Sequence, residues 1–232
     1  MKKMLLIVVL FSLGTLAYAD SFTTYATRAQ QNPSDIYDWG QFGPDGTAVS
    51  SPAGATSFNG LGATVSIAGL TMYTYVDSCP TCGEGSWNGN FEIGENLLYT
   101  GNQSGGGPGP LTIAFASGVS SVGFQIQDEF LGPFTATLQA FNGSTLLDTL
   151  VMLGVSNQNN DGSAIFMGLG DLTGPNITKI VISEQGTGDA NDFAINALSI
   201  GVNSTTPEPS SLVLLGTGLL AVGGMVRRKL KL

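Results

Sequence analysis

Residues 135–151, TATLQAFNGSTLLDTLV, carry the clearest structural signal of the chain. Apolar residues alternate with small or polar ones through 135–141, and a second run of β-like composition covers 146–151. Asn142-Gly143 separates the two runs, and this dipeptide is typical of the tight turn of a β-hairpin, whose central residues adopt positive φ. The stretch therefore predicts two antiparallel strands joined by a tight turn.

Shorter runs of the same kind flank this hairpin on both sides. The expected strands cover residues 36–42, 63–67, 71–76, 97–99, 111–115, 122–126, 164–167, 177–183 and 193–200. The runs at 63–67 and 71–76 are separated by Gly69 and resemble a second hairpin. About ten to twelve short strands, with Gly, Pro, Asn and Asp between them and no sustained helical periodicity, predict one all-β domain, a β-sandwich or jelly roll, over residues 35–201.

The N-terminal segment has the composition of a secretory signal peptide. Lys2 and Lys3 precede an apolar run from Met4 to Leu16, and Ala17-Tyr18-Ala19 matches the small-residue cleavage site. We therefore expect a signal helix over residues 1–19 and a mature chain that begins at Asp20. Residues 20–34 are polar and lack periodicity, so we expect a loose lead-in there.

The C-terminal segment consists of three consecutive parts. A Pro/Ser/Thr linker over 202–211 contains Pro207-Glu208-Pro209, and the segment 212–232 combines an apolar run, Leu212 to Val226, with a basic tail. The tail residues are Arg227, Arg228, Lys229 and Lys231. A fifteen-residue helix is roughly 22 Å long, short against a bilayer core of about 30 Å. The basic tail favours the cytoplasmic side, which leaves the β domain outside.

This order of parts closely resembles the PEP-CTERM sorting signal of Gram-negative bacteria. The resemblance implies that exosortase, a membrane-embedded cysteine transpeptidase, recognises Pro207, Glu208 and Pro209. It also implies export across the inner membrane, transient or permanent insertion through the C-terminal helix, and delivery to the cell surface or extracellular matrix, usually in producers of exopolysaccharide. Phrases such as Asn191-Asp-Phe-Ala-Ile-Asn196 resemble a recurrent group of such exported proteins and bring no activity with them. The alternative is a C-terminal anchor that is never cut.

The charge distribution excludes several classes of function. The net charge of the whole chain is −9, but six of its eight basic residues lie in the terminal segments. Residues 20–206 retain only Arg28 and Lys179 against 16 acidic residues, which gives a net charge of −14. Such a domain has no basic surface for nucleic acid. The chain also lacks histidine, so an enzyme would depend on carboxylates, and no acidic pair is clearly placed for catalysis.

Two short polar stretches are candidate disulfide and metal sites. Cys79 and Cys82 form Cys-Pro-Thr-Cys, which favours a local disulfide in an oxidising compartment over a redox motif, because no βαβ context surrounds it. Asp189, Asn191 and Asp192 offer oxygen ligands for a structural Ca²⁺, although an Asx-rich turn has the same composition. We expect no other cofactor, and we interpret Asp128-Glu129 as a solvated turn.

A third stretch is a candidate sugar contact. Trp87 lies beside Asn88 and Asn90, so its ring and the two amides could bind a sugar, although aromatic residues on strands more often belong to the core. The sequence thus predicts an exported, surface-sorted, non-catalytic protein associated with extracellular polysaccharide or biofilm matrix. The alternatives are a carboxylate-dependent enzyme acting on glycans and a homotypic adhesion module.

Overall fold

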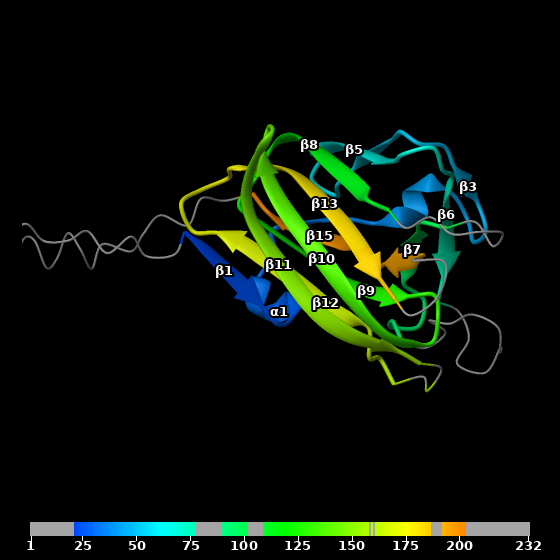
Figure 1. Ribbon diagram of the computed structural model, residues 1–232. Helices are drawn as coiled ribbons and strands as arrows, with labels where there is room; N and C mark the ends of the chain where they lie inside the picture. Colours follow the sequence, from blue (N-terminus) through cyan, green and yellow to red (C-terminus); the bar gives the residue numbers. More distant parts are fainter. Residues whose placement is uncertain are drawn as a thin grey trace, which may run out of the picture.

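The computed structural model describes residues 21–77, 90–101, 109–157, 159, 161–186 and 192–202. These residues form two antiparallel β-sheets packed face to face, which confirms the predicted all-β sandwich (Figure 1). The signal segment, both cysteines and the C-terminal sorting segment lie outside the described residues. No helix in the described ranges is long and apolar enough to cross a membrane.

The first sheet, sheet A, contains nine strands. Its main path is β1-β12-β9-β14-β7-β6-β3, and β15 pairs with both β9 and β2. The bounds are β1 Phe22–Tyr25, β2 Asp35–Tyr37, β3 Ala48–Val49, β6 Met72–Val76, β7 Asn96–Tyr99, β9 Ser121–Asp128, β12 Ile165–Asp171, β14 Phe193–Ile195 and β15 Leu198–Gly201.

The second sheet, sheet B, contains six strands in the order β11-β10-β13-β8-β5-β4. The bounds are β4 Ala53–Thr56, β5 Gly62–Ile67, β8 Leu111–Val119, β10 Gly132–Asn142, β11 Thr145–Ser156 and β13 Ile177–Gln185. In Figure 1, β10, β11 and β13 form the layer in front of β9 and β12. β11 is an edge strand of this sheet.

The core lies between the sheets, and the alternation of buried and more exposed residues is clearest in sheet B. In β10, Phe134, Ala136, Leu138 and Ala140 are buried, whereas the residues between them are more exposed. β13 contributes Ile180 and Ile182 in the same way, and β9 contributes Val122, Phe124 and Ile126, although most residues on its other face are buried as well. Because successive side chains of a strand point to opposite faces, the residues between these core residues point away from the other sheet.

The predicted hairpin at 135–151 is confirmed. β10 and β11 pair from Gly132↔Ser156 to Asn142↔Thr145, with Gly143 at φ 59° in the turn. A register shift between Ala140 and Phe141 places Ala140 opposite Asp148 and Phe141 opposite Leu146. The two long strands form the outer part of sheet B.

The strands predicted at 63–67 and 71–76 are present as β5 and β6, but their predicted pairing is wrong, and the strand predicted at 36–42 is too long. β5 and β6 do not form a hairpin, because β5 belongs to sheet B and β6 to sheet A. The turn at Gly69, with φ 73°, is a corner between the sheets, and a corner has the same local signal as a hairpin turn. The strand predicted at 36–42 ends at Tyr37, because the Asp38 side chain accepts the N–H of Gly40 (2.7 Å) and begins a 3₁₀ helix, η1 Trp39–Phe42.

The polar lead-in predicted for 20–34 is part of the sandwich. β1 pairs with β12 from Phe22↔Asp171 to Tyr25↔Gly168. The short helix α1, Arg28–Gln31, follows and lies beside β1 and β12 (Figure 1). Thr27 caps this helix by accepting the N–H of Gln30 (3.2 Å). Gln31 is buried on sheet A, where its amide donates to Ser121 Oγ (3.1 Å). Sequence periodicity could not reveal this segment, because β1 and α1 have only four residues each.

Candidate functional site

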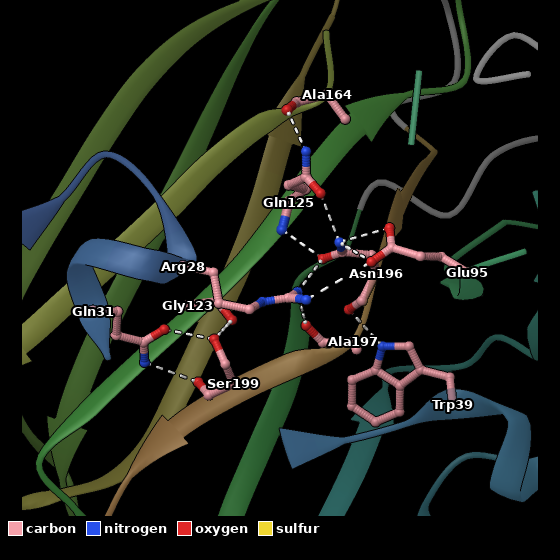
Figure 2. Close-up of polar contacts among 10 residues, drawn as sticks. All are labelled: Arg28, Gln31, Trp39, Glu95, Gly123, Gln125, Ala164, Asn196, Ala197 and Ser199. Atoms are coloured by element: carbon pink, nitrogen blue, oxygen red, sulfur yellow. Dashed lines mark hydrogen bonds and ion pairs between the residues drawn. The ribbon is translucent and has the colours of Figure 1, made fainter. Parts of the chain in front are cut away.

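A buried amide, Asn196, organises the polar groups on the outer face of sheet A (Figure 2). Residues 193–200, predicted as one strand, are divided into β14 and β15, and Asn196 lies in the break. Its Nδ2 donates to Glu95 Oε2 (2.9 Å) and Gln125 Oε1 (2.7 Å). Its Oδ1 accepts from Gln125 N (2.7 Å) and Arg28 Nη2 (3.2 Å). The amide therefore uses all its hydrogen-bonding capacity within the protein.

Arg28 connects α1 to this network. Its Nη2 also donates to the carbonyl of Ala197 (2.7 Å), and its Nη1 lies 3.7 Å from Glu95 Oε1. Trp39 contributes from the other side by donating its indole N–H to the carbonyl of Asn196 (2.8 Å). The network joins α1, η1, the residue before β7, β9 and the β14–β15 break. We call these residues, Arg28, Trp39, Glu95, Gln125 and Asn196, the Asn196 network.

A groove of about 510 Å³ adjoins the Asn196 network. Its lining includes a guanidinium, two carboxylates, an amide and an aromatic ring, from Arg28, Glu92, Glu95, Gln125 and Phe166. Arg28 and Glu95 are held by the network, whereas Glu92 is exposed. Hydroxyl-rich ligands need both hydrogen-bonding groups and a flat apolar surface, and this groove offers both.

A second polar cluster lies at one end of the sandwich. Asp128 is the last residue of β9 and Glu184 is near the end of β13, so the two come from different sheets. Their side chains are 0% and 5% exposed. Asp128 Oδ1 accepts the N–H of Phe130 (3.1 Å), but Asp128 Oδ2 and both Glu184 oxygens have no hydrogen-bond partner. We call Asp128 and Glu184 the acidic pair.

Burial perturbs the ionisation of the acidic pair. Loss of water contact raises the pKa of Glu184 to about 8, and the nearby charges of Asp128 and Asp192 add to this shift. Burial likewise raises the pKa of Asp128 to about 6, although the Phe130 N–H opposes the shift. Near neutral pH the protein therefore holds carboxyl groups that resist full ionisation.

Two further carboxylates surround Tyr99 near the acidic pair. The Tyr99 hydroxyl hydrogen-bonds to Glu129 Oε2 and to Asp192 Oδ2, the latter at 3.1 Å. Burial raises the pKa of Glu129, and the bond from Tyr99 partly offsets this shift. The solvated turn predicted at Asp128-Glu129 is wrong because β9 extends to Asp128. That residue lies two positions after Ile126 and so faces the core.

The structure describes only two of the predicted site residues, Asn90 and Asp192. Asn90, expected to contact sugar, is fully buried; its amide donates to the carbonyl of Asn157, so Asn90 does not form an exposed contact. Asp192 is 2% exposed and bonded to Tyr99. Trp87, Asn88, Asp189, Asn191, Cys79 and Cys82 lie outside the described residues, as do Pro207, Glu208, Pro209 and the basic tail. Within the part of the chain that the structure describes, no group of three or more His, Cys, Asp or Glu side chains is arranged to hold a metal.

Sequence reasoning did not identify Arg28, Glu95, Gln125 or Phe166, because their proximity depends on long-range packing. It also missed the acidic pair, for which a local signal exists. Alternation through Val122, Phe124 and Ile126 assigns Asp128 to the core face, and the same rule applied to Ile180 and Ile182 assigns Glu184 there.

Comparison with known proteins identifies the C-terminal segment. Residues 205–229 match the family model described as the PEP-CTERM protein-sorting motif. The chain therefore carries an exosortase sorting signal, which directs export and delivery to the cell surface or extracellular space through a membrane-anchored intermediate. No curated protein sequence matches the chain.

Solved structures with similar folds share little sequence with this chain. A DUF4465 family protein from Bacteroides caccae ATCC 43185 has a TM-score of 0.46 and 10% identity, covering 72% of this chain and 99% of its own. TmCBM61 in complex with beta-1,4-galactotriose has a TM-score of 0.33 and 14% identity, covering 61% and 88%. CsCBM6-3 from Clostridium stercorarium in complex with cellobiose has a TM-score of 0.26 and 12% identity, covering 73% and 94%.

Proposed function

We propose that this protein is a non-catalytic, surface-sorted module that contacts extracellular polysaccharide through the groove beside the Asn196 network. The sorting signal delivers the β domain to the cell surface or extracellular space, where it can meet extracellular polysaccharide. The observation that carries the proposal is the combination of Phe166, Gln125 and Glu92 in one groove. An aromatic ring packs on the apolar face of a sugar, and the amide and carboxylate bond its hydroxyls.

The charge of the domain narrows the type of polysaccharide. A net charge of −14 over residues 20–206 repels polyanions at low ionic strength. A neutral polymer meets no such repulsion, and a groove with several polar groups suits its hydroxyls. We therefore expect neutral polysaccharides to bind better than uronic-acid-rich ones.

The positions of the carboxylates favour binding over catalysis. Asp128 and Glu184 have raised pKa values, as catalytic acids do, but both are buried between the sheets. In the groove, Glu95 accepts hydrogen bonds from Asn196, which occupies the oxygens that a general base would use. Glu92 remains as a single exposed carboxylate there. Hydrolysis of a glycosidic bond normally requires two.

Affinity electrophoresis of residues 20–206 in gels containing the host's exopolysaccharide tests this proposal. The wild type should be retarded, and Phe166→Ala should migrate as in a gel without polysaccharide. Phe58→Ala is the matched control, because Phe58 is an aromatic residue, 82% exposed, that does not line the groove. Equal retardation of the two variants would refute the groove assignment. Released reducing ends would refute the non-catalytic role.

A second candidate function, homotypic adhesion, is favoured by the edge strand β11. Val151, Leu153 and Val155 project from it and are 56%, 78% and 58% exposed. No described strand pairs with the free side of β11. A long apolar edge is a template for antiparallel pairing with a second copy, which would join two sheets B. Sedimentation of the wild type should show concentration-dependent dimers, and Leu153→Lys should remove them; a monomeric wild type at all concentrations would exclude this function.

A further inference from the structure

We propose that Asp128 and Glu184 bind a divalent cation with a preference for oxygen ligands, namely Ca²⁺, at the end of the sandwich. The proposal is independent of the polysaccharide groove. It concerns side chains that the packing of the two sheets brings together, and it differs from the turn at 189–192 that the sequence suggested.

The acidic pair converges on one point of the backbone. A Cβ built on Gly186 would overlap Asp128 Oδ2 and would lie 3.3 Å from Glu184 Oε1. The two carboxylates therefore share the space above Gly186, one arriving from sheet A and the other from sheet B. Glycine at this position lets the Asp128 carboxylate approach the main chain, because a Cβ would occupy the place of Oδ2.

Nothing among the described residues neutralises the acidic pair. Three of its four carboxylate oxygens, Asp128 Oδ2 and both oxygens of Glu184, are buried without a hydrogen-bond partner. The two basic side chains of the described domain are engaged elsewhere, Arg28 on Glu95 and Lys179 over the ring of Phe141 at 4.4 Å. Buried carboxylates without partners are strongly unfavourable unless a proton or a cation compensates them.

The chemistry of the pair selects the cation. Two carboxylates provide hard oxygen ligands, and no histidine exists in the chain to favour zinc or copper. Ca²⁺ accepts six to eight oxygens in flexible geometry and commonly completes its shell with main-chain carbonyls and water. Mg²⁺ demands a stricter octahedron and dehydrates reluctantly, so it suits a buried site of this kind less well.

Calorimetric titration of the full-length protein, purified in mild detergent and treated with a chelator, tests the proposal. At pH 8, CaCl₂ should bind with about one ion per chain and raise the melting temperature. Asp128→Asn and Glu184→Gln keep the side-chain shapes and should each weaken Ca²⁺ binding about tenfold or more, because ligand charge sets the affinity of oxygen sites. Asp45→Asn, which removes an exposed carboxylate, should bind Ca²⁺ as the wild type does.

Three outcomes would overturn the proposal. Absence of heat and of any melting shift with CaCl₂ in the wild type would show that no such site exists. Undiminished Ca²⁺ binding by the Asp128→Asn/Glu184→Gln double variant would place the site elsewhere. Binding of MgCl₂ as tight as that of CaCl₂ would refute the Ca²⁺ preference. Because the two variants keep their shapes and remove buried charge, metal-free samples should fold, and circular dichroism verifies this.

Discussion

The Asn196 network and the acidic pair both bury polar groups against β9, yet they differ in how completely those groups are satisfied. Every polar atom of the Asn196 amide has a partner within the protein, and Arg28 Nε is the one buried polar side-chain atom of the network without a partner among the described residues. In the acidic pair, three carboxylate oxygens have none. A satisfied buried network rigidifies a fold, whereas an unsatisfied one destabilises it unless something else is bound. The Asn196 network therefore holds neighbouring elements together, and the acidic pair has the properties of a binding site.

The largest loss of stability should come from disrupting the Asn196 network. Asn196→Ala removes both hydrogen-bonding groups of the amide and takes a partly buried partner from each of Arg28, Glu95 and Gln125. We expect the free energy of unfolding to fall by about 3–5 kcal/mol, since each orphaned buried group costs about 1–3 kcal/mol. Urea denaturation measures this change. Asn59→Ala, at an exposed asparagine, should cost less than about 1 kcal/mol; an equally small loss for Asn196→Ala would contradict the structural role.

Removing a carboxylate from the acidic pair should instead stabilise the protein in the absence of metal. The folded-state pKa of Glu184 is raised to about 8, so its contribution to stability is fully present below the unfolded pKa of about 4.5 and is lost as pH rises through 8. Asp128 acts in the same direction up to about pH 6. Glu184→Gln should therefore be more stable than the metal-free wild type at pH 8, by about 2–4 kcal/mol, and should flatten the pH dependence. Chelated samples melted from pH 4 to 9 test this, and a wild type whose stability rises with pH would contradict it.

The smallest change in stability should come from a conservative substitution within the Asn196 network. Arg28→Lys keeps the positive charge near Glu95 but loses the guanidinium geometry in which Nη2 donates to Asn196 and Ala197 while Nη1 lies beside Glu95. We expect a loss of about 1–2 kcal/mol, well below that of Asn196→Ala. Raising the salt concentration should not reproduce this loss, because the lost interactions are mainly hydrogen bonds to neutral groups. A salt-sensitive loss would instead assign the effect to the Arg28–Glu95 ion pair.

Local patterns predicted local structure well. The Asn142-Gly143 turn and the strands beside it followed from alternation and turn chemistry, and the sorting signal followed from the order of its three parts. The assignment failed at Gly69, where a corner between sheets has the same signal as a hairpin. It failed again at Asp38, whose side chain begins a 3₁₀ helix after three residues of strand.

The two polar regions depend on contacts that differ greatly in range. Arg28 and Asn196 are separated by 168 positions, so no spacing rule brings them together. The acidic pair, by contrast, could have been found by extending the alternation of two strands to their ends. The charge of Asp128 suggested a solvated turn, whereas the strand periodicity, which is the stronger constraint in this domain, assigns both Asp128 and Glu184 to the interior.

The position of β15 has a mechanical consequence. This strand is hydrogen-bonded to β2 on one side and to β9 on the other, and the described chain ends one residue after it, at Val202, three positions before the sorting motif. Tension applied through the C-terminal sorting segment would therefore pull along β15, which is hydrogen-bonded on both sides. Its hydrogen bonds would bear the load together in shear and would not open one after another, so the attachment should resist extraction under flow through a slow rate of forced unfolding.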